Sequence, residues 1–415
     1  MAELVTDDDI DYAHGMIKTI CTEIGPGCPC SPQERSRAMK VKEEMEKSVD
    51  SVNVEEFTCA PDAYIGWFRL GAILATTAMV CFYISLVPGD AVLFSTIAFA
   101  VSIFIIVLFI CQFVLTARIF DFMFPKRQSL NIVGKFNTSS TGAPKRIIIF
   151  SGHHDSAMVY TWFQYLKGGY YIAIAFLMLG ILFLAAMLSI RLFSLLGGVQ
   201  LDWIVSTLIF STWTIFPVTI VVAIFFTGSG KNGGSVPGAS DNLAAVSICL
   251  AIGRIVKRHP ELIPVDTEIR LVTFGCEEAG ERGSYAYVTS HLAELRAADA
   301  VVVNFESICR AEMRVFTSDM NNFVKNDPSV VALIAEAAKV AGVPCDVKPF
   351  WFGGGGTDAL PFSKMHIKAA SLFSMKVPQQ MIEFYHQKWD NYDKVPKEAL
   401  SNALKIAVAF LQRFK

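Results

Sequence analysis

Side chains that can bind metal ions or transfer protons stand in five short clusters along this chain of 415 residues. In chain order the clusters are His153, His154 and Asp155; Asp241; Glu277 and Glu278; Glu306; and His386 and Asp390. One such cluster is more often a turn or a helix cap than part of a site, but five in one chain point to a common site. We expect each cluster to end a strand, because sites in open α/β sheets lie at the carboxyl ends of the strands.

Mixed histidine and carboxylate ligands with an open coordination position are typical of Zn²⁺ in hydrolases. Two zinc ions about 3.5–4 Å apart can share one bridging carboxylate and one water. Two histidines and three carboxylates are enough to hold such a pair, and one further acid then remains as a general base. The five clusters supply these side chains, so the sequence predicts a two-zinc hydrolytic centre.

The residues around these clusters predict alternating helices and strands, and therefore an α/β class. A charged amphipathic helix is expected over residues 32–50, and strands over 51–58, 129–136 and 146–150. Further strands run into Glu277 and Glu306, and an apolar helix follows Asp241. Two more helices are expected over 329–341 and 396–414.

The composition departs from that of a soluble enzyme, with 53% hydrophobic and 18% charged residues. Four apolar stretches are long enough to cross a bilayer, at about 64–86, 91–117, 169–190 and 203–226. They form two predicted transmembrane hairpins, 64–117 and 169–226. Residues 1–62, 118–168 and 227–415 then lie on one face of the membrane as a single discontinuous domain.

The side of the membrane follows from the basic residues. Arg118, Lys126 and Lys167 flank the spans on the side of the predicted domain, whereas the hairpin tips carry only Arg191. Positive charge stays in the cytoplasm, so we expect a cytoplasmic domain. The 10 cysteines show no paired spacing, and Cys28-Pro29-Cys30 is too tight for a usual zinc pair. We therefore interpret that segment as incidental.

The order H-x-D, Asp-Asn, Glu-Glu, an acid after a strand, and a late histidine resembles the co-catalytic zinc aminopeptidase family, peptidase family M28. This family includes secreted bacterial leucine aminopeptidases, glutamate carboxypeptidase and the glutaminyl cyclases. The resemblance covers roughly residues 20–60 and 129–415, apart from the second hairpin. It implies a mixed-sheet zinc-peptidase fold, phosphorylase/hydrolase-like, with two inserted transmembrane helical hairpins.

The resemblance also implies a role for each residue. His153, Glu278, Glu306 and His386 match zinc ligands, Asp241 the carboxylate that bridges two zinc ions, Asp155 the group that orients His153, Glu277 the general base, and Tyr385 a tyrosine that polarises the scissile carbonyl. Glu306 departs from the family pattern, in which many members have aspartate. Asp358 resembles a turn near the pocket without an assigned role. The implied activity is that of a membrane-bound metallo-aminopeptidase acting on N-terminal peptide bonds.

Two other functions stay open. One is a glutaminyl-cyclase-like acyltransferase, which uses one zinc ion, and the other is a binding or scaffold protein on an inactive peptidase fold. Retention of all five ligands and of Glu277 argues against the scaffold. Because the second hairpin lies between Asp155 and Asp241, we expect the cleft to face the bilayer and to accept apolar or membrane-derived peptides. The net charge of −2 shows no basic excess, so nucleic acid is not an expected partner. The oligomeric state has no sequence signal.

Overall fold

The computed structural model describes residues 4–87, 89–137, 144–228, 234–351 and 353–414. The chain folds into two compact units, and each is assembled from separate segments. Unit 1 comprises Met1–Pro61, Pro125–Val159 and Lys231–Lys415. Unit 2 comprises Asp62–Phe124 and Tyr160–Gly230.

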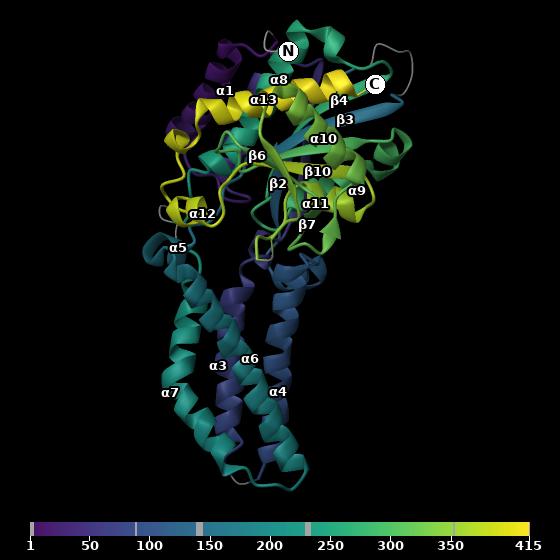
Figure 1. Cartoon of the computed structure of the whole chain (residues 1–415). Coiled ribbons are helices and arrows are strands. Elements are labelled where there is room, and N and C mark those ends of the chain that lie inside the picture. The colour runs from purple at the N-terminus through teal and green to yellow at the C-terminus, as the bar shows by residue number, and fades with distance from the viewer. Residues whose placement is uncertain (1–3, 88, 138–143, 229–233, 352, 415) are drawn as a thin grey trace. The chain divides into compact units, whose positions relative to one another are not determined.

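Unit 1 is built on an eight-stranded mixed sheet with the order β1-β2-β4-β3-β5-β10-β6-β9 (Figure 1). Strands β4, β3, β5 and β10 at its centre are parallel, and β1 and β2 pair antiparallel at one edge. The strands are β1 (Ser51–Cys59), β2 (Arg127–Phe136), β3 (Arg146–His153), β4 (Thr267–Phe274), β5 (Val301–Glu306), β6 (Met313–Phe316), β9 (Cys345–Lys348) and β10 (Lys368–Phe373). A short pair, β7 (Ser318–Asp319) and β8 (Val324–Lys325), lies outside this sheet.

The central strands are buried along almost their whole length because helices cover both faces of the sheet. Side chains of a strand alternate between the two faces. On β3, Ile148 and Phe150 enter one apolar core, and Ile147 and Ile149 enter the other. This three-layer arrangement leaves the carboxyl ends of the parallel strands as the edge where polar side chains can gather.

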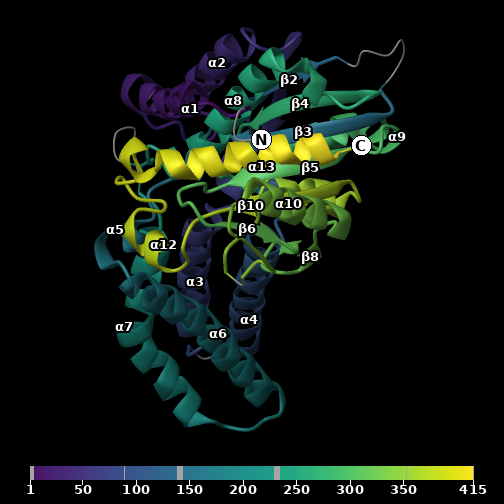
Figure 2. The same ribbon diagram turned by 45° about the horizontal axis from the view of Figure 1, so that its top comes forward.

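Two groups of helices make the outer layers of unit 1. The first core contains α1 (Asp7–Thr19), α2 (Pro32–Met45), α8 (Ala244–Arg258), α10 (Pro328–Ala341) and α13 (Lys397–Arg413). The second core contains α9 (Arg282–Ala297) and α11 (Ala359–Lys364). Figure 2 shows α13 running across one face of the sheet, close to α8. The predicted helix over 32–50 is shorter than expected, because residues 46–50 form the turn into β1.

Unit 2 consists mainly of four long apolar helices in which α3 contacts α4, α4 contacts α6, α6 contacts α7, and α7 contacts α3. The helices are α3 (Trp67–Ile84), α4 (Ala91–Leu108), which continues as η3 (Phe109–Val114), α6 (Gly169–Leu196) and α7 (Asp202–Ile224). A short helix, α5 (Thr161–Leu166), precedes α6. These neighbours close a four-helix bundle.

Among the described residues, five helices are long and apolar enough to cross a membrane. Four of them are the bundle helices of unit 2, and at most 44% of each apolar window is buried inside the protein. The fifth, Ala239–Arg258, is 94% buried and lies in the core of unit 1. Length and composition select this segment because a helix buried on all sides has the same apolar sequence as a membrane helix.

Candidate metal centre

Three of the predicted site segments lie at or just after the carboxyl ends of neighbouring strands of the sheet. His153 is the last residue of β3 and Glu306 the last residue of β5, while Glu277 and Glu278 follow the end of β4. Strand β3 pairs in parallel with both β4 and β5, and His153 stands opposite Phe274 in the register. The register therefore places all three segments at one edge of the sheet.

The expectation that every cluster ends a strand is wrong for Asp241 and His386. Asp241 lies in the turn η5 (Ala239–Leu243) that leads into α8, and its peptide bond to Asn242 is cis. His386 follows the short helix α12 (Gln379–Glu383). Asp390, from the same late cluster, accepts hydrogen bonds from the backbone N–H groups of Ser240 at 2.8 Å and Asp241 at 3.2 Å. The buried Asp390 carboxylate thus joins these two loops.

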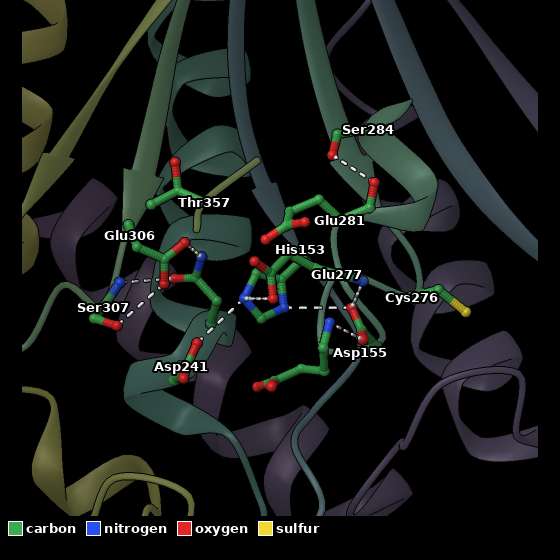
Figure 3. A network of polar contacts seen from close by, with 12 residues as sticks. His153, Asp155, Asp241, Cys276, Glu277, Glu281, Ser284, Glu306, Ser307 and Thr357 are labelled. Carbon is green, nitrogen blue, oxygen red and sulfur yellow. Dashed lines mark hydrogen bonds and ion pairs between the residues drawn. The ribbon is translucent and has the colours of Figure 1, made fainter. Parts of the chain in front are cut away.

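The two carboxylate oxygens of Asp241 face two different histidines. Its Oδ1 lies 3.1 Å from Nε2 of His153, and its Oδ2 lies 3.1 Å from Nε2 of His386 (Figure 3 shows the first contact). Two groups of potential ligands share this residue, namely His153, Asp241 and Glu306, and Asp241, Glu278 and His386. The ligand atoms in each group lie within 4.8 Å of one another. A carboxylate shared in this way is what a pair of adjacent metal ions requires.

Neighbouring polar groups hold these ligands in place. Asp155 lies 3.3 Å from Nδ1 of His153, on the opposite side of the ring from Asp241, and accepts the backbone N–H groups of Glu277 and Glu278 at 3.1 Å each (Figure 3). The side chain of Asn242 donates to Glu306 at 3.2 Å. Asp155 therefore links the end of β3 to the loop after β4, as a group that orients a ligand does.

Glu277 differs from its neighbour Glu278 in its surroundings. Its Oε2 lies 3.6 Å from Nε2 of His153, and its side chain is 11% exposed. The side chain of Glu278 is 7% exposed, and its Oε1 lies 3.4 Å from Nε2 of His386. Glu278 therefore lies with the second ligand group, although a further candidate group joins His153, Glu277 and Glu278, and Glu277 is the more accessible of the two acids.

Crowding of buried carboxylates dominates the electrostatics of the site. Burial and the charges of nearby acids raise the pKa of Glu277, Glu278 and Glu306. Burial alone lowers the pKa of His386, but the carboxylates of Glu278 and Asp241 outweigh it and raise this pKa to about 10. Burial likewise raises the pKa of Asp358, to about 7. So many acids in one buried place require compensating positive charge, and divalent metal ions supply it.

Metal ions of the zinc type fit this donor set. Each group offers one imidazole nitrogen together with carboxylate oxygens, which are ordinary Zn²⁺ ligands. Each group has three protein ligands, so a fourth position is left for water or substrate, as in catalytic zinc sites. The residues present therefore suit two metal ions that share Asp241.

The remaining predicted residue, Tyr385, stacks its ring on that of His386, with centroids 3.9 Å apart and an interplanar angle of 18°. Asp358 is buried in the turn before α11. His154 points elsewhere, with Nδ1 3.2 Å from the hydroxyl of Thr273. Within the described ranges, His153 and His386 are the histidines found in candidate metal groups.

The structure also brings together residues that sequence reasoning missed. Cys30, which we interpreted as incidental, lies with Cys59 and Cys276 in a further candidate metal group. These cysteines are 29 and 217 positions apart along the chain, so no local spacing signals them.

Comparisons with known proteins agree with this geometry. The model of peptidase family M28 matches residues 224–411, a range that contains every ligand except His153. Aminopeptidase YwaD of Bacillus subtilis is 29% identical over 177 residues. That alignment spans 40% of this chain and only 35% of the relative, about a third of its length.

Solved structures share the fold. The zinc aminopeptidase BSAP from Bacillus subtilis aligns with a TM-score of 0.53 at 16% identity, covering 97% of this chain and 93% of that chain. An aminopeptidase from Aneurinibacillus sp. strain AM-1 aligns with a TM-score of 0.55 at 14% identity, covering 100% of this chain and 96% of that chain. A glutaminyl cyclase from Fimbriiglobus ruber aligns with a TM-score of 0.55 at 12% identity, covering 98% of this chain and 95% of that chain. With the family match, the conclusion is that residues 224–411 of this chain are similar to peptidase family M28 and that the chain shares its fold with zinc aminopeptidases and a glutaminyl cyclase.

Proposed function

We propose that this chain is a membrane-bound, zinc-dependent aminopeptidase that hydrolyses N-terminal peptide bonds. The observation that carries the proposal is Asp241, whose two oxygens each face a histidine from a different ligand group. The aminopeptidases among the relatives and structural neighbours support it.

The proposed chemistry assigns a task to each nearby side chain. Two zinc ions, if held by the two groups that share Asp241, would supply a water of lowered pKa and Lewis acidity toward the scissile carbonyl. Glu277, the more exposed acid, accepts a proton from the attacking water and returns it to the leaving amine. Asp155 orients His153, and Tyr385 donates a hydrogen bond to the developing oxyanion.

The isosteric pair Glu277→Gln and Glu278→Gln tests the division of labour. We expect Glu277→Gln to keep its metal and to lose activity by about 10²–10⁴-fold, the usual contribution of a general base. Glu278→Gln should lose metal, because it removes a ligand. Metal analysis and hydrolysis of aminoacyl amides measure both effects. A Glu277→Gln protein with near wild-type turnover would refute the assignment of the base.

A glutaminyl cyclase is the second candidate, because the fold matches glutaminyl cyclases as well as it matches aminopeptidases. The two differ in metal count and in reaction. Two zinc ions per chain and chelator-sensitive hydrolysis of aminoacyl amides support the aminopeptidase. One zinc ion and cyclisation of N-terminal glutamine support the cyclase.

We further propose that α3, α4 with η3, α6 and α7 span the membrane. Their outward side chains are large and apolar, with Ile73 64% and Trp213 78% exposed, whereas Ser95 and Ser102 on α4 are each 1% exposed. Small residues at helix contacts and large apolar residues outside are typical of membrane bundles. Gly180 continues this pattern, because an added Cβ would lie 2.4 Å from Oγ1 of Thr219.

The proposed topology places unit 1 in the cytoplasm. A membrane-impermeant thiol reagent should label Gln200→Cys, at the exposed loop between α6 and α7, in intact cells. It should label Glu398→Cys, exposed on α13, only after lysis. The reverse pattern would place unit 1 outside. Because the second hairpin is inserted between Asp155 and Asp241, we also propose apolar or membrane-derived peptides as substrates, tested by rates on peptides of graded hydropathy.

A further inference from the structure

Three cysteine thiols from distant parts of unit 1 converge at one point. The Sγ of Cys30 lies 3.3 Å from that of Cys276 and 3.7 Å from that of Cys59, and the last two are 3.7 Å apart. Cys30 precedes α2, Cys59 ends β1, and Cys276 follows β4. The three sulfurs thus form a nearly equilateral triangle, which we call the thiol triangle.

The size of the triangle matches a single metal ion. Ligand sulfurs around a tetrahedral zinc ion, with Zn–S about 2.3 Å, are about 3.8 Å apart. All three measured separations lie within about half an ångström of this value. A disulfide, by contrast, needs one pair at about 2.05 Å and leaves the third thiol unused. The geometry therefore favours an ion that engages all three sulfurs together.

A buried carboxylate holds two of the three cysteines in position through hydrogen bonds to their backbone. Glu34, on α2, accepts the backbone N–H groups of Cys30 and Cys276 at 2.8 Å each, and the hydroxyl of Ser129 at 2.9 Å. Both cysteines have a left-handed backbone, with φ of 59° and 55°. Such conformations are uncommon for residues other than glycine and persist where the surroundings hold them. The two thiols are thus positioned by contacts rather than by chance proximity.

The triangle is separate from the candidate metal centre although it is adjacent in sequence. Cys276 immediately precedes Glu277, yet its sulfur is directed away from His153 (Figure 3). Its sulfur neighbours are the other two thiols, in a small apolar cluster with Phe57 and Ala279. Both sites therefore share one loop after β4 but use different donor atoms.

We propose that Cys30, Cys59 and Cys276 bind a third metal ion of the zinc class through three thiolates. Binding of a divalent ion by three thiols releases three protons and leaves one coordination position for water. Thiolate ligands prefer zinc over harder ions, and cysteine thiolates are common ligands in structural zinc sites. An ion here ties α2, β1 and the loop that carries Glu277 and Glu278 to one point.

Co²⁺ substitution tests the proposal on the purified full-length protein, because a thiolate-bound cobalt ion gives a charge-transfer absorption that nitrogen and oxygen ligands do not. We expect the wild-type protein to show this absorption, and Cys59→Ser and Cys30→Ser to lose it together with one metal ion per chain. The matched control is Cys345→Ser, on β9 and outside the triangle. It should retain both.

Alkylation provides a second measurement that does not depend on a variant folding. The metal-loaded protein should protect three more thiols from alkylation than the chelator-treated protein does. The proposal is overturned if cobalt gives no thiolate absorption in the wild-type protein. It is equally overturned if mass analysis of the protein purified without reductant finds two of the three cysteines joined as a disulfide. Neither result bears on the two-zinc centre, which contains no sulfur ligand.

Discussion

The close approach of β3 to α8 leads to a quantitative prediction for Gly152→Ala. An ideal Cβ on Gly152 lies 2.4 Å from the Cβ of Ala245. Ordinary carbon contacts are about 3.5–4.0 Å, so strand and helix must separate by more than about 1 Å. Neither partner is the end of a flexible side chain, and the displacement must therefore move the backbone.

We expect two measurable consequences. Overpacking of this kind costs about 1–3 kcal/mol, which lowers the melting temperature of a domain of this size by about 2–5 °C. In addition, Gly152 precedes His153, and Ala245 follows Asp241 by four residues. The variant should thus widen the 3.1 Å approach between His153 and Asp241, two proposed ligands of one metal ion. A change in the residues that orient a metal ligand typically weakens metal affinity by about 10–100-fold.

Thermal unfolding with and without zinc, together with zinc titration against a competing chelator, measures both effects. The control is Gly15→Ala in α1, where an added Cβ meets nothing within 4 Å. It should raise stability slightly, because alanine favours a helix by up to about 1 kcal/mol over glycine. If Gly152→Ala matches the wild-type protein in melting temperature and zinc affinity, the reasoning from the β3–α8 contact is wrong.

Two further predictions concern stability. Gly180→Ala should destabilise the helical bundle by about 1–3 kcal/mol in detergent unfolding, because an added Cβ would lie 2.4 Å from Oγ1 of Thr219. The control Gly71→Ala should be tolerated, because its Cβ would lie 3.7 Å from Ile105. Equal effects of the two substitutions would contradict this prediction. Burial opposes ionisation of Asp9, but hydrogen bonds from Arg258 and Thr6 lower its pKa below 3.8, so its stabilisation is present at neutral pH and is lost as the pH falls through the lowered value. Asp9→Asn should therefore lower the free energy of unfolding by about 1–3 kcal/mol at neutral pH, with a difference from the wild-type protein that shrinks in acid; the control Asp8→Asn, on an exposed pair, should change little.

Local sequence determined the elements and the donor types. Apolar runs such as the one before His153 predict a buried strand because hydrophobic side chains are contiguous there, and β3 is buried along almost its whole length. The long uncharged stretches likewise predict the helices of unit 2, since length and composition are properties of the segment itself. The order of the histidines and acids indicates the family resemblance from the sequence alone, because the type and order of the candidate ligands are properties of the chain itself.

Tertiary structure alone decided which side chains meet. The sharing of Asp241 between His153 and His386 depends on a strand end, a turn and a late loop, which are brought together by sheet register and by Asp390. The surroundings of the apolar helices are also a property of the tertiary structure: the segment that contains α8 is 94% buried in unit 1, whereas at most 44% of each bundle window is buried. The thiol triangle joins residues up to 246 positions apart, and such contacts arise from packing rather than from spacing.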